Sequence, residues 1–439
     1  MPDFTTAQVH AGEVTDGDHG ARIGPVYLTA GFEFESFAQA GDRFTGEEAG
    51  YTYSRNGNPT TASLERRVAG LENGTEAIAV GSGQAALTVA VLGLLKAGDH
   101  LLSAQRVYSG TRGLLETGLG RLGIEIEFVE DPHDIAEWRR RIRPTTRLLF
   151  GETIANPSND VLDLEAVAGV AHENGIPFIV DNTLATPYLL RPAEHGADIV
   201  IHSASKFLGG HGSALGGIVV DSGNYDWASS PFDQLTRPDS WLQGASYLER
   251  YGQGAYIAYA RSVVASLFGP VLSPFNAFLI RQGIETLSLR MQRQSESALA
   301  VARWLESRPE VASVDYAGLA SHPSYQRAQR YLPRGQGAVL SFALQDGVGP
   351  AQSFYDAVEL FSRMTHIGDV RSLILHPAST THAHLDSDVR DLTGIVPGLL
   401  RLSIGVEDAT DLIEDLERGF AAILGSDATP VGTSLSIAS

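Results

Sequence analysis

The chain has no cysteine and only three methionines among its 439 residues. The absence of cysteine excludes disulfide bonds, thiolate nucleophiles and cysteine-ligated metal sites. Basic residues are also scarce, because 32 lysines and arginines stand against 52 aspartates and glutamates, which gives a net charge of −20. Such a charge argues against nucleic acid or an anionic membrane as a partner. These absences fit a cytoplasmic protein.

Long hydrophobic runs are scarce as well. The longest uncharged run, residues 77–95, is AIAVGSGQAALTVAVLGLL, and a Gly–Ser–Gly–Gln turn interrupts it near the middle. A strand, a turn and a buried helix therefore explain this run better than a membrane span. The first residues, MPDFTTAQVHAGEV, have neither the basic start nor the apolar core of a signal peptide.

Apolar β-type runs alternate with helical segments through the first half of the chain. Runs such as DHLLSA, TRLLFGE, PFIVDN and ADIVIHS are separated by helical stretches such as DLEAVAGVAHENG. This alternation predicts an α/β fold with a mostly parallel, doubly wound sheet. We expect an N-terminal arm over 1–60, a large domain over 61–265 with a loop insertion at about 221–254, a smaller C-terminal α/β domain over 266–425, and a disordered tail over 426–439.

Four positions near the ends of predicted strands carry the chemistry. The turn before Gly83 offers backbone N–H groups to an anion at a helix start, although a structural turn has the same sequence. Asp181 ends a buried strand, where a carboxylate either caps a helix or pairs with a cation. Lys206 lies between a serine-rich turn and a glycine-rich loop, and Arg401 stands in a late β-type run. A rigid arginine binds a carboxylate through two hydrogen bonds.

Together these four parts predict a pyridoxal 5′-phosphate (PLP) site. The lysine would bind the cofactor covalently, and the aspartate would keep its ring nitrogen protonated. The glycine turn would hold the phosphate, and the arginine would orient an amino-acid substrate.

The chain resembles the Cys/Met metabolism (trans-sulfuration) family of fold-type I PLP-dependent transferases, from about residue 4 to residue 424. The motifs that carry this resemblance are YTYSRNGNPT, GSGQAA, RVYSGT, GETIANP, IVDNT, HSASKFLGGHG, RSLILHPASTTH and RLSIGVED. Ser205 stands where many members have threonine, and Ser109 stands where glycine is common.

The resemblance implies a role for each motif residue. For the cofactor it implies that Lys206 is the attachment point, that Tyr108 stacks on the ring and that Asp181 lies at the ring nitrogen. It implies that the phosphate is bound within the same subunit by Ser82, Gly83, Gln84, Ser203 and Ser205. It also implies that Tyr53 and Arg55 bind the phosphate of the neighbouring subunit. For the substrate it implies that Asn156, Ser372 and Arg401 bind it. It implies that Lys206 and Tyr108 are the catalytic residues, and it also places Glu152 in the site. Because two of these residues act across an interface, it also implies an obligate homodimer and a homotetramer as a dimer of dimers.

Within the family, the features of this chain favour the sulfhydrylase subgroup. This subgroup uses sulfide or methanethiol to displace acetate from O-acetylhomoserine, giving homocysteine or methionine. The chain is longer than the γ-lyases, its insertion follows GGIVVDSGNYDW, and Gly110 stands where methionine γ-lyases carry a reactive cysteine. The alternatives are a γ-lyase, an enzyme that uses O-succinylhomoserine in the manner of a cystathionine γ-synthase, and a cofactor-binding protein without catalytic activity.

We predict no metal site. Three histidines, His376, His382 and His384, lie close together in the sequence, and we expect them to be loop residues near a substrate rather than metal ligands.

Overall fold

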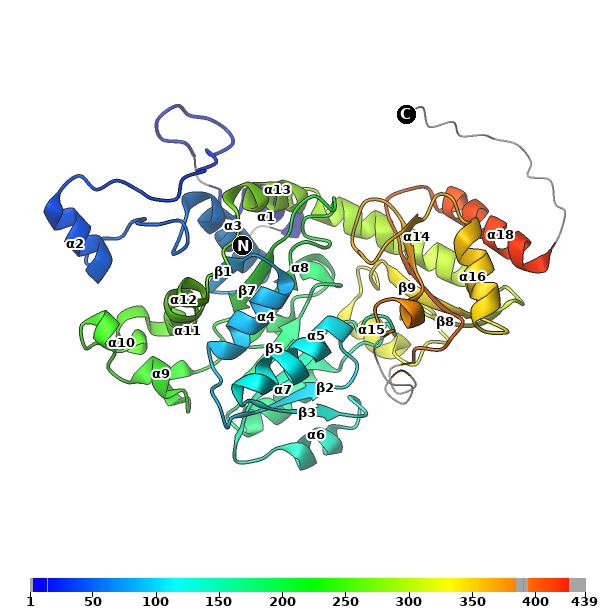
Figure 1. The fold of residues 1–439 in the computed structure, drawn as a ribbon, viewed down its shortest axis with the longest axis horizontal. Coiled ribbons are helices and arrows are strands. Elements are labelled where there is room, and N and C mark those ends of the chain that lie inside the picture. Colours follow the sequence, from blue (N-terminus) through cyan, green and yellow to red (C-terminus); the bar gives the residue numbers. More distant parts are fainter. Residues whose placement is uncertain (1–2, 14, 384–389, 391–393, 426–439) are drawn as a thin grey trace.

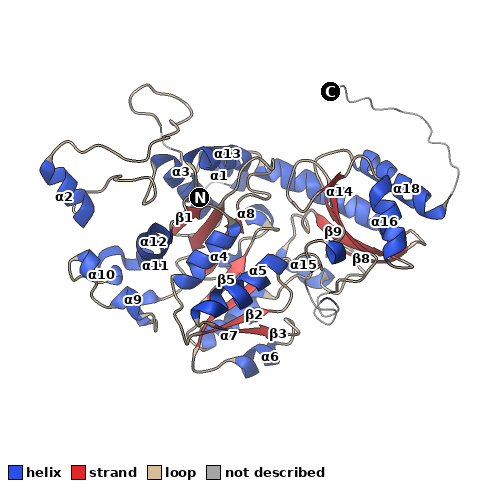
Figure 2. Ribbon diagram, viewed as in Figure 1, coloured by secondary structure: helices blue, strands red, loops and turns tan. Residues whose placement is uncertain are grey.

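The computed structural model of the protein describes residues 3–13, 15–383, 390 and 394–425. The described strands form two sheets that lie in different parts of the molecule (Figures 1 and 2). The first sheet spans residues 76–221 and the second spans 311–403. The α/β class predicted from the sequence is therefore confirmed.

The larger sheet has seven strands in the order β1-β7-β6-β5-β4-β2-β3. These strands are β1 (Glu76–Val80), β2 (His100–Ala104), β3 (Glu125–Val129), β4 (Thr146–Glu152), β5 (Phe178–Asp181), β6 (Ile199–Ser203) and β7 (Gly217–Asp221). From β6 across to β3 all neighbours run parallel, whereas β7 is antiparallel to both β6 and β1. The predicted mostly parallel sheet is thus confirmed. Its carboxyl-terminal strand ends meet at one edge, where ligands bind in such sheets.

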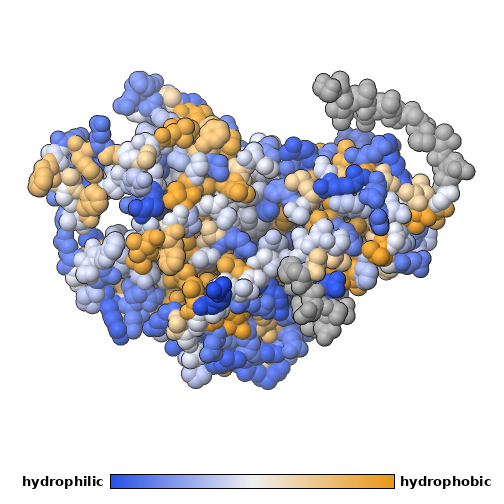
Figure 3. Space-filling view, in the orientation of Figure 1, coloured by the Kyte–Doolittle hydropathy of each residue, from blue (hydrophilic) through white to orange (hydrophobic). Residues whose placement is uncertain are grey.

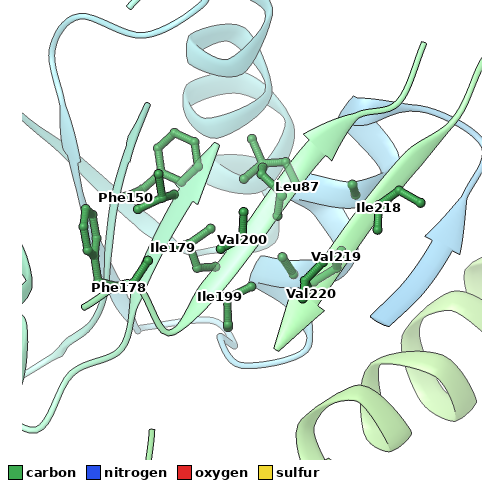
Figure 4. Packing of buried hydrophobic residues seen from close by; sticks show 14 of the residues in the cluster. Leu87, Phe150, Phe178, Ile179, Ile199, Val200, Ile218, Val219 and Val220 are labelled. Carbon is green, nitrogen blue, oxygen red and sulfur yellow. The ribbon is translucent and has the colours of Figure 1, made fainter. Parts of the chain in front are cut away.

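Apolar packing fixes this sheet against its helices. Successive residues of β6 are buried, so both faces of this strand are covered, as expected for a parallel sheet. Helix α4 (Gly83–Leu92) packs on β6 and β7, and α3 (Pro59–Leu71) packs on β1. Figure 4 shows side chains such as Leu87, Phe150, Val200 and Val219, which come from α4 and from strands of this sheet and belong to one buried cluster on its two faces.

The remaining helices surround the two sheets (Figure 1). They are α1 (Phe4–His10), α2 (Phe37–Thr45), α5 (Ser109–Gly113), α6 (Ile135–Arg141), α7 (Leu164–Glu173), α8 (Thr186–Leu189), α9 (Asp233–Thr236), α10 (Tyr247–Tyr251), α11 (Ala255–Tyr259), α12 (Ser266–Phe268), α13 (Pro274–Ile284), α14 (Leu287–Glu306), α15 (Tyr325–Tyr331), α16 (Val348–Ala357) and α18 (Ala409–Leu424). None of the helices in the described ranges is long and apolar enough to cross a membrane.

The second sheet has five strands in the order β10-β11-β12-β9-β8. They are β8 (Val311–Asp315), β9 (Val339–Leu344), β10 (Ser362–Arg363), β11 (Leu373–Leu375) and β12 (Leu399–Ser403). Helices α14, α16 and α18 supply apolar residues to its core, among them Ala298, Phe354 and Phe420. The face that α14 buries carries Ala298, Val301, Ala302 and Leu305.

The predicted loop insertion and the predicted N-terminal arm both contain helices. Residues 221–254, predicted as a loop insertion, contain α9 and α10, and Ser246 with Glu249 forms a capping box that starts α10. Trp227 anchors this stretch by stacking on Tyr256, with ring centroids 4.9 Å apart. The arm contains α1 and α2, and α2 lies well away from the first sheet (Figure 1). The tail expected over 426–439 lies outside the described residues.

Candidate active site

The carboxyl-terminal ends of β4, β5 and β6 open into one cavity of about 210 Å³ between the two sheets. It is lined by Ser82, Gly83, Gln84, Leu87, Tyr108, Thr111, Glu152, Ile154, Asn156, Asp181, Thr183, Leu184, Ser203, Ser205, Lys206, Leu215, Thr365, Ile367 and Arg401. This set brings together eleven of the sequence-predicted residues, which come from segments more than three hundred residues apart.

Lys206 follows β6 and reaches this cavity from the turn after the strand. Its Nζ lies 3.1 Å from Nδ1 of His366. Burial, helped by the charge of Arg401, lowers the pKa of Lys206 to about 8. A substantial fraction of this amine is therefore neutral near physiological pH, as a nucleophile or a base requires.

Asp181 is the last residue of β5 and is held by the turn that follows it. One of its carboxylate oxygens accepts a hydrogen bond from the Thr183 backbone N–H at 2.9 Å. Burial raises the pKa of Asp181, while Thr183 and the nearby His202 act in the opposite direction. A buried carboxylate of this kind is stabilised by a cationic ligand group.

Glu152 ends β4 directly beside Asp181, because the two residues are register partners in the sheet. Its carboxylate accepts a hydrogen bond from the Tyr108 backbone N–H at 2.7 Å. Burial, followed by the charge of Asp181, raises the pKa of Glu152 well above its usual range. The two neighbouring carboxyl groups therefore oppose each other's ionisation.

The start of α4 forms an anion cradle beside Lys206. Ser82 caps this helix by accepting a hydrogen bond from the Ala85 backbone N–H, which leaves the N–H groups at Gly83 and Gln84 at the helix start. Glycine is required at position 83 because an added Cβ would lie 2.7 Å from Cβ of Ser203. Backbone donors and the Ser203 side chain thus converge on one region of the cavity.

The Ser205 side chain lies in the cavity wall, but its hydroxyl is already engaged. It donates to the Gly216 carbonyl at 3.2 Å and accepts from the Gly216 backbone N–H at 3.0 Å. These bonds hold the Lys206 turn against the strand that follows. Its role on a phosphate stays a prediction.

Arg401 enters the cavity from β12 of the second sheet and is almost completely buried. Its guanidinium donates to Oδ1 of Asn156 at 3.2 Å and to the carbonyls of Thr365 and His366 at 3.2 and 3.3 Å. Its Nε is buried and has no hydrogen-bond partner in the part of the chain that the structure describes, and burial lowers the pKa of Arg401 to about 10. A buried cation with a free donor is suited to a ligand carboxylate.

Three predicted site residues lie outside the cavity. Tyr53 and Arg55 are on the arm, where the Arg55 guanidinium donates to the Ser266 carbonyl at 2.6 Å and lies over the Tyr53 ring. Ser372 is fully buried, and its hydroxyl donates to Glu407 at 2.9 Å and accepts from the Gly405 backbone N–H at 2.9 Å. The structure therefore does not support the predicted contact between Ser372 and a substrate, because its hydroxyl is occupied away from the cavity.

Within the described ranges, no group of three or more His, Cys, Asp or Glu side chains is placed to hold a metal ion. Both ring nitrogens of His376 bond to protein atoms, Oγ of Ser379 at 2.7 Å and the Pro397 carbonyl at 2.8 Å. His384 lies outside the described residues.

Sequence reasoning missed His366, Thr365 and Thr183. His366 contacts Lys206, Thr365 offers its carbonyl to Arg401, and the Thr183 backbone holds Asp181. Only Thr183, two residues after a strand-end aspartate, had a local signal, since that spacing is typical of a side-chain turn.

The residues of the cavity fit PLP. Its phosphate matches the start of α4, its ring nitrogen matches the buried Asp181, and its aldehyde matches the amine of Lys206. The unpartnered Nε of Arg401 remains for a substrate carboxylate. The fold and this cavity define a PLP-dependent enzyme of fold type I.

The chain belongs to the Cys/Met metabolism PLP-dependent enzyme family, whose model matches residues 5–421. It is 44% identical over 96% of its length to the O-acetyl-L-homoserine sulfhydrylase of Corynebacterium glutamicum, of which 97% is covered. It is 41% identical over 95% of its length to the enzyme of the same name from Leptospira meyeri, of which 96% is covered.

A crystal structure from Campylobacter jejuni superposes on the chain with a TM-score of 0.91 at 33% identity, covering 95% of this chain and 99% of that one. That protein is described as an O-acetylhomoserine (thiol)-lyase and contains a pyridoxyl-lysine monophosphate. The cystathionine γ-lyase of Lactobacillus plantarum superposes with a TM-score of 0.83 at 34% identity, covering 96% and 100% of the two chains.

Proposed function

We propose that this chain is an O-acetylhomoserine sulfhydrylase, which replaces the acetate of O-acetylhomoserine with sulfide or methanethiol and forms homocysteine or methionine. The cavity that contains the Lys206 amine, Asp181 and the Arg401–Asn156 pair supports PLP chemistry on an amino acid. The observation that carries the choice of reaction is the similarity to known sulfhydrylases, at 41% to 44% identity over nearly the whole chain.

PLP, when bound, withdraws electrons from the substrate amino acid and acidifies its Cα–H bond. Asp181 would hold the ring nitrogen protonated, and Tyr108 would stack on the ring. Gly83, Gln84 and Ser203 would bind the phosphate.

The chain's own residues position the substrate and move its protons. Arg401 and Asn156 bind the α-carboxylate, which fixes the substrate relative to Lys206. Lys206 takes the Cα proton, because its lowered pKa of about 8 leaves a neutral amine available. It then gives this proton up to an acceptor within the site, which restores the neutral amine, and only afterwards takes a Cβ proton. Tyr108, which lines the same cavity, assists the departure of acetate from Cγ.

A γ-lyase, or an enzyme that uses O-succinylhomoserine, is the alternative. The specific observation in favour of a γ-lyase is that the chain superposes on a cystathionine γ-lyase over nearly its whole length. The residues described above bind the amino-acid half of the substrate, so they are equally suited to each of these reactions.

The test is to incubate the purified protein with O-acetylhomoserine, with and without sulfide, and to measure homocysteine and 2-oxobutyrate. Homocysteine formed only in the presence of sulfide supports the proposal. Formation of 2-oxobutyrate and ammonia regardless of sulfide would identify a γ-lyase instead. The same assay with O-succinylhomoserine determines the acyl preference.

We also propose that the active form is at least a homodimer, and a homotetramer as a dimer of dimers. Tyr53 and Arg55 lie outside the cavity of their own chain, and the arm that carries them exposes large apolar side chains. A partner subunit that covers this arm would bring both residues to its own phosphate site. The cytoplasmic location stays a prediction.

A further inference from the structure

His366 lies in the loop between β10 and β11, and this loop packs tightly on the Lys206 turn. The Gly368 backbone N–H donates to Oγ of Ser403 at 2.9 Å, and the Val370 N–H donates to the Gly210 carbonyl at 2.9 Å. A Cβ on Gly368, whose φ is +77°, would lie only 2.6 Å from the backbone nitrogen of Phe207. The loop backbone therefore rests directly on the peptide that follows Lys206.

His366 contacts the two residues that matter most in the proposed reaction. Its Nδ1 lies 3.1 Å from Nζ of Lys206, and its carbonyl accepts a hydrogen bond from the Arg401 guanidinium at 3.3 Å. One residue thus links the lysine of the first domain to the arginine of the second sheet.

The surroundings of His366 keep its ring neutral. Burial, followed by the charge of Lys206, lowers the pKa of His366 to about 4. The other charged groups facing it are Asp369, Arg401 and Arg371. A neutral ring that accepts a hydrogen bond at Nδ1 carries its own proton on Nε2.

The second ring nitrogen of His366, Nε2, faces away from Lys206. Nε2 of His366 is buried and has no partner among the described residues. His366 lines a second cavity of about 390 Å³, which shares Ser205 and Leu215 with the first. The imidazole therefore stands in the wall between the two cavities, with Lys206 as its partner at Nδ1.

We propose that His366 is a positioning residue, which holds the free Lys206 amine through Nδ1 and aligns it with Arg401 through its main chain. This inference rests on the proposed role of Lys206 as the base. A neutral acceptor stabilises the ammonium form of lysine more than the amine, because the hydrogen bond to the charged form is stronger. His366 thus sets both the direction of the amine and the pH at which it loses its proton.

The composition of the chain makes this inference directly measurable. The sequence has only two lysines, Lys96 and Lys206, and Lys96 is exposed. The rate at which acetic anhydride acylates each lysine, measured by peptide mass spectrometry as a function of pH, reports the titration of each amine. The full-length protein freed of cofactor is used, and Lys96 serves as the internal reference.

Three substitutions of His366 distinguish the contribution of Nδ1 from that of Nε2. His366→Leu removes both, His366→Asn keeps a polar atom close to the position of Nδ1, and His366→Gln keeps one close to Nε2. We expect the acylation midpoint of Lys206 to fall by about one pH unit in His366→Leu and His366→Gln. In His366→Asn it should stay near the wild-type value, and the midpoint of Lys96 should not move in any variant.

An unchanged or raised midpoint in His366→Leu, with Lys96 at its normal value, overturns the proposal. So does a pattern in which glutamine preserves the midpoint and asparagine does not. After cofactor is restored, kcat should fall in His366→Leu with little change in KM and recover partly in His366→Asn. Because the acylation measurement needs no substrate, it can fail while the sulfhydrylase assay succeeds, and the reverse also holds.

Discussion

At the scale of single residues, burial determines the chemistry of the cavity. It lowers the pKa of Lys206 to about 8 and that of Arg401 to about 10, and it raises the pKa of Asp181. Each of these shifts disfavours the charged form of its own group. A phosphate, a protonated ring nitrogen and a substrate carboxylate supply the opposite charges, so ligand binding and the ionisation of the site are coupled.

The two lysines give a matched pair of substitutions. Lys206→Ala should abolish turnover, because no other amine lies in the cavity within the described part of the chain. Lys96→Arg should retain full activity, because Lys96 is exposed and lies outside the cavity. Steady-state rates of both variants, together with the absorbance of bound cofactor, check this. Residual wild-type turnover in Lys206→Ala would refute the site.

Arg401→Lys tests the carboxylate-binding role. A lysine keeps the charge but loses the planar fork, so we expect KM to rise about 10- to 100-fold. The matched control is Arg371→Lys, because Arg371 is paired with Asp369 and does not line the first cavity. Initial rates over a range of O-acetylhomoserine concentrations measure the effect. Equal KM values in the two variants would place the carboxylate elsewhere.

At the scale of elements, one buried carboxylate connects segments that belong to the two sheets. Asp160, after β4, accepts hydrogen bonds from Arg106 at 3.0 Å, His133 at 2.8 Å and the Ser324 hydroxyl at 2.5 Å. Ser324 directly precedes α15, which lies between β8 and β9 of the second sheet, so the contact ties the segment after β4 to a connection within the second sheet. Burial alone would raise the pKa of Asp160, but His133, Ser324 and Arg106 together hold it well below its usual range.

This arrangement predicts a pH-dependent stability. A carboxylate whose pKa is depressed by folding stabilises the native state above its unfolded pKa of about 4, and the stabilisation is lost as the pH falls through the native pKa. Asp160→Asn should therefore lower the apparent melting temperature by several degrees at pH 7, with a smaller difference at pH 3. Thermal unfolding followed by circular dichroism at both pH values measures it. A difference that stays constant with pH would show that charge is not the cause.

At the scale of the whole molecule, the N-terminal arm exposes large apolar side chains that no other part of the described chain covers. Phe37 and Phe44 of α2 are 98% and 74% exposed. Figure 3 shows apolar side chains at this end of the molecule and over the surface next to it. Apolar patches of this kind mark interfaces. Tyr53 and Arg55 follow α2 in sequence, so covering α2 and completing a neighbouring phosphate site are expected to occur together.

Mixing two inactive variants tests this expectation. Arg55→Ala would damage the phosphate site of the neighbour, and Lys206→Ala would damage the site of its own chain. In a random mixture, half of the dimers contain one chain of each kind, and each of these has one intact site, so about a quarter of wild-type activity should return. Activity after co-refolding or subunit exchange measures this. No recovery, despite exchange shown by mass, would mean that Arg55 acts within its own chain.

The sequence by itself determined the fold class and most of the site. Asp181, Lys206 and the turn at Gly83 each stand next to a strand end, and parallel strands bring such ends to one edge of the sheet. Their chemistry then predicts PLP, because few other cofactors need an anion cradle, a buried aspartate and a lysine together. Local pattern was sufficient here because each residue is fixed by the strand or turn that carries it.

Which groups from the two sheets contact each other could be seen only in the folded chain. The contact between His366 and Lys206 joins residues 160 positions apart, and it exists because the loop at Gly368 packs on Phe207. The same packing gathers four partners around Asp160, of which Arg106 and His133 come from the region of the first sheet and Ser324 and Arg327 from the region of the second. Such contacts depend on how the regions around the two sheets pack against each other. The local periodicity of the sequence contains no information about that packing.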